Sequence, residues 1–213
     1  MTEILPTLRQ PFTASWQQRR ADVMGMYLFL ATEIMLFGGL VVVLMFYRFA
    51  HPAEIIAASS RLNPILGTVN TAVLLTSSLF VALAAEAGRR RARGACILNF
   101  LAAMGLGVAF LVVKAIEYAD EYVHGLIPGL GIVGAADAGI LKVFMSVYFV
   151  ATGLHAVHLG VGIALVGWTI SRLWRNAHIE KGDSIPVELV GLYWHFVDVV
   201  WIFLFPALYL VRT

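Results

Sequence analysis

Three ionisable residues lie in the apolar segment that ends the sequence. His195 and Asp198 interrupt residues 187–211, which are otherwise nearly all hydrophobic, and Glu188 lies seven positions before His195. A helix would place the three in one sector, where His195 and Asp198 could form a hydrogen bond or an ion pair. Ionisable groups are costly at membrane depth, so we expect them to face protein and to form a polar network that fixes helix packing.

A second apolar segment carries His155 and His158 on one face. Two histidines at this spacing could bind a metal, or one of them could pair with His195 across a haem. No carboxylate or cysteine adjoins them in the sequence, and we expect His195 to lie several residues nearer the cytoplasm. We therefore favour structural hydrogen bonding, and we assign neither a metal site nor a haem to this chain.

Glu33 lies about ten residues into the first apolar segment, roughly 15 Å along a helix. Its neighbours in sequence offer Thr32 and two glycines but no cation, so we expect the carboxyl to be protonated near neutral pH. Two interpretations remain open. Glu33 either handles protons or contacts lipid, as intramembrane acids often do, or it is a neutral acid hydrogen-bonded between helices.

Lys114 and Glu117 are the remaining intramembrane pair. Their separation of three residues suits an ion pair on one helix face near the periplasmic interface. We interpret the pair as structural, with the lysine extending toward the interface.

The composition is that of an integral membrane protein. Of the 213 residues, 60% are hydrophobic and 13% charged, with a mean hydropathy of +0.84, whereas soluble domains are about 25% charged. The single cysteine, Cys96, excludes an internal disulfide framework. The net charge of +2 gives no support to nucleic-acid binding. No phosphate-binding loop, serine-nucleophile or metalloprotease motif occurs, so we assign no catalytic residue.

Five apolar segments are long enough to cross a bilayer, which predicts an all-α bundle. They cover residues 23–47, 65–85, 95–118, 140–170 and 187–210. Residues 1–22 form an N-terminal tail, and 23–213 form one domain. The absence of an inverted repeat disfavours a small proton-coupled carrier built on Glu33.

Basic residues predict the orientation of these helices. Three Lys or Arg residues lie in the tail, four in the second connection and three in the fourth. Ten of the 15 therefore lie on one side of the membrane. Connections rich in Lys and Arg stay in the cytoplasm. We therefore expect a cytoplasmic N-terminus and a periplasmic C-terminus.

Five stretches resemble subunit III of the haem-copper cytochrome c oxidases. They are MYLFLATEIMLFGG, NTAVLLTSSLFVALA, KAIEY, VYFVATGLHAVHLGVG and YWHFVDVVWIFLFP, which occur in the family's order and touch all five helices. YWHFVDVVW is the most specific of them. The resemblance covers nearly the whole chain after residue 22.

This resemblance implies an accessory subunit of a bacterial inner-membrane terminal oxidase. Such a subunit has no redox centre, binds subunit I, which carries the haem and copper, and shares the complex with subunit II. It binds phospholipids and supports proton uptake by subunit I. Glu33 matches the family's carbodiimide-reactive carboxyl. Polar positions of the family, with roles in packing or lipid contact, match Glu117, His155, His158, His195 and Asp198.

Two departures from the family leave alternatives open. Many members have seven helices, with two before the one that holds the glutamate, so this chain resembles the five-helix form found in quinol oxidases. Many also have paired histidines where this chain has Ala85 and Glu86. The same group includes an accessory protein of bacterial nitric oxide reductases, so the kind of complex stays open. The electron donor, cytochrome c or quinol, is bound by other subunits, so this chain does not identify it.

Overall fold

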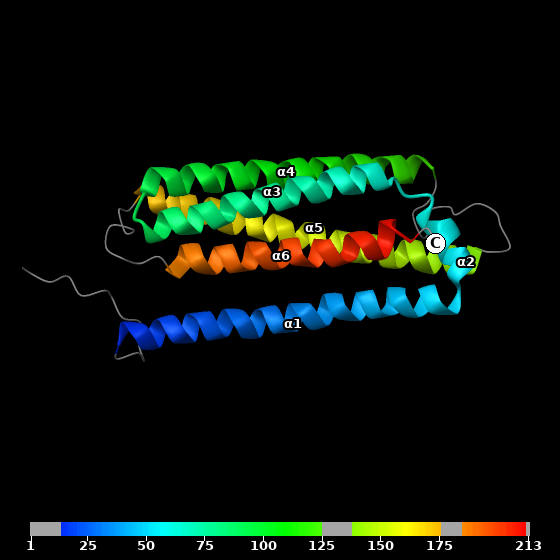
Figure 1. Cartoon of the computed structure of the whole chain (residues 1–213), viewed down its shortest axis with the longest axis horizontal. Coiled ribbons are helices and arrows are strands. Elements are labelled where there is room, and N and C mark those ends of the chain that lie inside the picture. The colour runs from blue at the N-terminus through cyan, green and yellow to red at the C-terminus, as the bar shows by residue number, and fades with distance from the viewer. Residues whose placement is uncertain (1–13, 125–137, 176–184, 212–213) are drawn as a thin grey trace, which may run out of the picture.

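The fold is a bundle of long helices, seen in a computed structural model that describes residues 14–124, 138–175 and 185–211. Six helices make up these ranges (Figure 1): α1 Ser15–Ala50, α2 Pro52–Ser59, α3 Pro64–Arg89, α4 Arg93–Val123, α5 Ala138–Arg175 and α6 Ile185–Tyr209. All except α2 are long and apolar enough to cross a membrane. The predicted all-α class and the five spanning helices are confirmed.

The helices are not equally enclosed. α3, α4, α5 and α6 form the bundle, and α1 lies along its side against α6 and α5 (Figure 1). α6 occupies the centre, with α1, α3 and α5 around it. This arrangement places the polar side chains of α6 inside protein, as their cost in lipid requires.

The first helix is longer than the sequence suggested. It begins at Ser15 rather than at residue 23, so the second part of the predicted tail is helical. Arg19 in this extension reaches across to Glu188 of α6, with Nη2 and Oε2 2.8 Å apart. The first part of the tail, residues 1–13, lies outside the described residues.

The short helix α2 was missed by the sequence reasoning, which placed only a connection around His51 and Pro52. Proline suits the first position of a helix, and Glu54 in the first turn favours the helix dipole. Ser59 at the end of α2 donates its hydroxyl to the Leu208 carbonyl at 2.7 Å. α2 therefore folds over the end of the bundle where α6 finishes.

Local signals fix both ends of α3. Asn63 caps its first turn, accepting a hydrogen bond from the Ile65 amide at 3.0 Å. At the other end Arg91 takes a left-handed conformation, with φ of 59°, and the Ala92 amide bonds the Ala87 carbonyl at 2.9 Å. This tight turn makes α3 and α4 antiparallel neighbours.

Trp194 is the central packing residue of the bundle. Its indole lies against two glycines, where an added Cβ would stand 3.0 Å from the ring at Gly107 and 3.3 Å at Gly162. The indole nitrogen donates to Ser77 Oγ at 2.9 Å. Small residues on α4 and α5 therefore let both helices approach α6 closely.

Candidate functional site

Glu33 and His158 form a polar pair between α1 and α5. Their Oε2 and Nε2 atoms are 3.0 Å apart, and His158 Nδ1 lies 2.8 Å from the Leu154 carbonyl. A carbonyl can only accept, so Nδ1 carries a hydrogen and Nε2 faces the carboxyl. One proton therefore lies between the two side chains, either on the carboxyl or on the imidazole.

The expectation that Glu33 has no basic neighbour was wrong, because it considered only residues close in sequence. His158 lies 125 positions away and comes from another helix. The pair is largely enclosed, with 16% of the Glu33 side chain and 15% of the His158 side chain exposed. Phe37 packs its edge against the imidazole at 5.2 Å, and Tyr193 donates to the His158 carbonyl.

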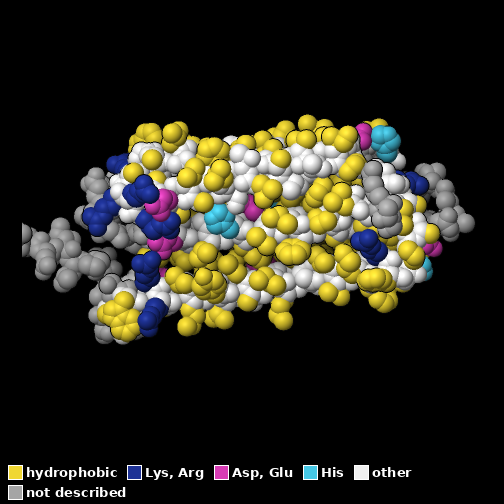
Figure 2. Space-filling model, viewed as in Figure 1, with side chains coloured by type: hydrophobic (Ala, Val, Ile, Leu, Met, Phe, Trp, Pro, Cys, Tyr) yellow, Lys and Arg dark blue, Asp and Glu magenta, His cyan; other side chains and the backbone are white. Residues whose placement is uncertain are grey.

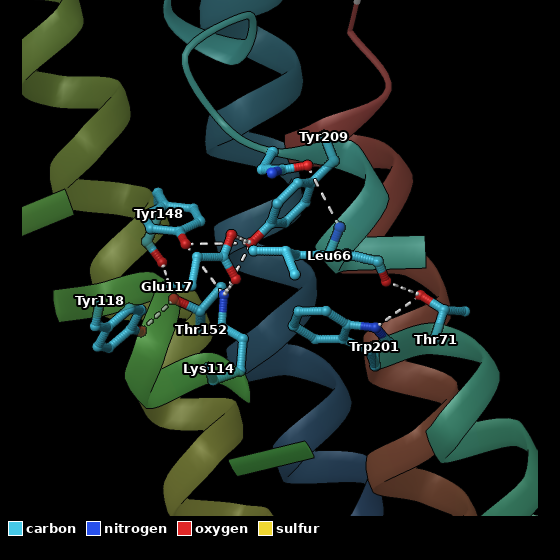
Figure 3. A network of polar contacts seen from close by, with 11 residues as sticks. Leu66, Thr71, Lys114, Glu117, Tyr118, Tyr148, Thr152, Trp201 and Tyr209 are labelled. Atoms are coloured by element: carbon cyan, nitrogen blue, oxygen red, sulfur yellow. Dashed lines mark hydrogen bonds and ion pairs between the residues drawn. The ribbon is translucent and has the colours of Figure 1, made fainter. Parts of the chain in front are cut away.

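A second polar group, here called the Lys114 cluster, consists of Lys114, Glu117, Tyr148 and Tyr209 (Figure 3). Lys114 Nζ lies 2.9 Å from Glu117 Oε2, 3.1 Å from the Tyr148 hydroxyl and 2.8 Å from the Tyr209 hydroxyl. Tyr209 in turn donates to Glu117 Oε1 at 2.6 Å. The cluster joins α4, α5 and α6 and uses all three hydrogens of the ammonium.

The predicted pair of Lys114 with Glu117 is confirmed, but the lysine does not extend to the interface. It is 4% exposed. Four aromatic rings surround its ammonium with centroids 5.0–5.5 Å away: Tyr118, Tyr148, Trp201 and Tyr209. The complete set of hydrogen bonds and the cation–π contacts offset part of the cost of burying this charge. Tyr148 and Tyr209 come from α5 and α6, which spacing within α4 cannot reveal.

The three ionisable residues of α6 contact different neighbours. Glu188 pairs with Arg19 of α1, while His195 Nδ1 lies 2.7 Å from Ser78 Oγ of α3. Asp198 is 3% exposed, and within the described residues its carboxyl oxygens have no hydrogen-bond partner, although Ser78 lies nearby. The predicted bond between His195 and Asp198 was therefore wrong.

The polar network of α6 runs between helices, as we expected for the ionisable residues of this segment. Besides Ser78, α3 supplies Ser77 to Trp194 and Thr71 to Trp201, the latter at 3.0 Å. Sequence reasoning missed these hydroxyls. Their spacing along one apolar segment was the available signal, since serine and threonine in membrane helices commonly bond a neighbouring helix.

His155 differs from His158 although the two are three positions apart. It is completely buried between Phe110 and Trp201, with ring centroids 5.5 and 5.0 Å away. Neither of its ring nitrogens has a hydrogen-bond partner in the part of the chain that is described. The described ranges contain no group of three His, Cys, Asp or Glu side chains arranged to hold a metal ion.

The surface separates charge from apolar side chains. In Figure 2 arginine and lysine side chains gather at one end, where α1 and α4 begin and α3 finishes, and hydrophobic side chains cover the length of the bundle. A shallow hollow on α1 lies at this basic end and is lined by Arg19, Arg20 and apolar side chains that include Tyr27 and Leu28. This distribution suits a protein surrounded by lipid.

Comparison with known proteins gives consistent matches. The family model described as cytochrome c oxidase subunit III matches residues 17–212. Cytochrome c oxidase subunit 3 of Synechocystis sp. is 32% identical over 190 residues, which are 88% of this chain and 74% of that protein. A probable quinol oxidase subunit 3 of Staphylococcus haemolyticus is 27% identical over 190 residues, 88% of each chain.

A third relative is a longer protein. The haem-copper oxidase subunit I+III of Aeropyrum pernix is 29% identical over 193 residues, which are 88% of this chain and 22% of that protein. This chain thus resembles one segment of a polypeptide whose name includes two subunits.

Proposed function

The chain belongs to the cytochrome c oxidase subunit III family, and we propose that it is a non-catalytic accessory subunit of a haem-copper terminal oxidase. The observation that carries this proposal is the family match over residues 17–212, which includes all five spanning helices. The haem and copper would belong to subunit I, and this chain would bind beside it.

The Aeropyrum relative supports direct contact with subunit I, because its name places subunits I and III in one polypeptide. We propose that subunit II shares the complex. α1 is the least buried of the five spanning helices in the described ranges, and its apolar side chains include Met35 at 80% and Phe46 at 65% exposed. We propose that this exposed apolar face of α1 contacts lipid or a partner subunit.

We propose that the pair of Glu33 and His158 supports proton uptake by subunit I. The two side chains lie within hydrogen-bond distance of each other and keep 16% and 15% of their surfaces exposed. A shared proton between a carboxyl and an imidazole can be given up or regained with little rearrangement. The haem and copper would lie in subunit I, so the effect of the pair would be on proton supply rather than on electron transfer.

We also propose that the chain binds phospholipid. The hollow on α1 combines two arginines with an apolar wall, which matches a phosphate head group above acyl chains. Arg19 also pairs with Glu188, and the Arg20 guanidinium lies over the Trp16 ring at 5.2 Å. Exchanging the lipid composition of the purified complex would show which head group is retained.

The proposed location is the bacterial cytoplasmic membrane, with the arginine-rich end in the cytoplasm. Ala57 of α2 and Ala92 of the turn between α3 and α4 are both exposed. α2 and that turn lie at opposite ends of the bundle (Figure 1). In a chain without Cys96, a membrane-impermeant thiol reagent applied to intact cells should label Ala57→Cys and spare Ala92→Cys. The reverse pattern would overturn the orientation.

Purification of the tagged chain from its own host in mild detergent tests the function itself. We expect a larger haem- and copper-containing subunit to co-purify in equal amount, and the chain freed from it to lack a visible haem spectrum. A Soret band in the isolated chain that disappears in His195→Ala would instead support a self-contained haem protein. The other co-purifying subunits would separate a cytochrome c oxidase from the quinol oxidase suggested by the Staphylococcus relative.

A further inference from the structure

One face of α6 is not covered by the other described helices. Its residues recur every three or four positions, the spacing of a single helix face, and each is half-buried or exposed: Leu192, His195, Val199, Ile202 and Pro206. Val199 is 47% and Ile202 42% exposed. We call these five residues the α6 strip. In Figure 2 a histidine side chain reaches the surface between α3 and α6, away from both ends of the bundle.

His195 presents an open hydrogen-bonding group on this strip. Its Nδ1 atom lies 2.7 Å from the Ser78 hydroxyl, whereas Nε2 has no hydrogen-bond partner within the described residues. If Ser78 donates to Nδ1, Nε2 carries a hydrogen and needs an acceptor; if Nδ1 donates, Nε2 is an acceptor that needs a donor. His195 lies near the middle of the 25-residue helix, at a depth where lipid chains offer neither.

A second open group lies on the same strip. Pro206 stands inside α6 and has no amide hydrogen, so the Ile202 carbonyl loses its usual helical partner. Both residues belong to the strip, and the freed carbonyl therefore faces it. Neighbouring helices, hydroxyl side chains or ordered water satisfy such carbonyls in membrane proteins. Ile202 follows His195 by seven positions, which is about 10 Å along the helix.

Other exposed polar side chains at membrane depth find partners in their own helix. The Thr68 and Thr76 hydroxyls of α3 each donate to a carbonyl four residues earlier at 2.8 Å, and the Thr32 hydroxyl of α1 donates to the Phe29 carbonyl at 2.6 Å. Side chains satisfied in this way can face lipid. The α6 strip differs from these surfaces, because its polar groups need a partner from outside the described helices.

We propose that the α6 strip is the surface on which a membrane helix of subunit I docks. That helix would place one hydrogen-bonding side chain against His195 Nε2 and a donor against the Ile202 carbonyl. Two polar residues seven positions apart would meet both groups, because residues at this spacing share a helix face. Val199 would supply apolar contact between them. The choice of subunit I as the partner rests on the proposed function.

Photocrosslinking in the intact complex tests this surface. Benzoylphenylalanine incorporated at Val199, illuminated in the host membrane, should join this chain to subunit I, and mass spectrometry of the crosslinked band identifies the product. Val112 on α4 is the matched control, because it is also a valine and is 53% exposed against 47% for Val199. Benzoylphenylalanine at Val112 should give no crosslink to subunit I.

Substitution tests the polar contact. His195→Leu should raise the fraction of complex that loses this chain in detergent about fivefold, the size of one interhelical hydrogen bond in a membrane. Ser78→Ala removes only the partner of His195 within this chain and should have a smaller effect. If Ser78→Ala releases the chain as readily as His195→Leu, His195 acts inside the bundle and the proposed contact is wrong.

The crosslinking result does not depend on whether a His195 variant folds. Crosslinks from Val199 only to lipid, to another subunit or to a second copy of this chain would overturn the docking surface, as would equal yields with subunit I from Val199 and Val112. If subunit I still co-purifies in that case, the subunit assignment stands while the surface fails. If no haem-copper subunit co-purifies, the proposed function itself fails.

Discussion

α1 and α6 are both long apolar helices, yet they are held in place in different ways. In its most apolar 18-residue window α6 has 50% of its residues buried, and α1 has 17%. α6 is fixed by close packing and by bonds to α3 and α4. α1 is joined to the bundle by polar contacts through Arg19 and Glu33. Since lipid is as apolar as leucine, packing alone holds a peripheral membrane helix weakly, and polar contacts then decide its position.

The same contrast separates the two polar groups. The Lys114 cluster is closed, because every hydrogen of the ammonium and both oxygens of Glu117 are bonded. The pair of Glu33 and His158 lies on the α1 side and keeps some exposure. Substitutions in the cluster should therefore lower stability, whereas substitutions in the pair should alter function while the fold persists.

The largest effect is expected for Lys114→Met, which leaves Glu117 buried without its cation. Removing one partner of a buried ion pair costs about 3–5 kcal/mol. Thermal denaturation of the purified complex, followed by loss of this subunit, would measure it. The double variant Lys114→Met with Glu117→Gln removes both charges and should recover much of the loss. Equal stability of Lys114→Met and wild type would show that the Lys114 cluster does not stabilise the packing of α4 against α5 and α6.

A smaller loss is expected for Tyr209→Phe. The variant keeps the ring but removes the hydroxyl that donates to Glu117 and accepts from Lys114. Hydrogen bonds to charged groups contribute about 1.5–3 kcal/mol, so the same assay should show a loss in this range. Tyr122→Phe on the exposed face of α4 is the control. Identical behaviour of the two variants would mean that the Tyr209 hydroxyl adds nothing.

Glu33→Gln should change function more than stability. Glutamine can still bond His158, and a single interhelical hydrogen bond in a membrane is worth about 1 kcal/mol or less. We expect normal haem content and initial electron transfer in the complex, with reduced proton pumping or a shorter lifetime during turnover. Thr32→Val, which alters an adjacent exposed residue, is the matched control. If Glu33→Gln shows wild-type proton pumping and wild-type lifetime, Glu33 contributes only to helix packing.

The smallest effect is expected for Arg19→Gln. More than half of the Arg19 side chain is exposed, and such ion pairs contribute about 0.2–1 kcal/mol. The loss should shrink further as salt screens the pair. Arg20→Gln, which removes a neighbouring charge that does not pair with Glu188, provides the comparison. A loss as large as that of Lys114→Met would show that α1 depends on this contact far more than its exposure suggests.

The sequence by itself determined the features that depend on residues close together in the chain. Segment length and composition identified the five spanning helices, because crossing a bilayer requires about 20 apolar residues. The spacing of Lys114 and Glu117 predicted their pairing, because residues three apart share a helix face. Ordered motifs along the whole chain indicated the family.

Only the tertiary structure decided which helices meet and what each polar side chain contacts. His158 rather than a sequence neighbour faces Glu33, Ser78 rather than Asp198 binds His195, and two tyrosines from other helices enclose Lys114. The physical reason is the solvent. In a membrane the outward and inward faces of a helix are both apolar, so hydrophobic periodicity does not report its rotation. That rotation is set by packing, as where the Trp194 indole fits against Gly107 and Gly162.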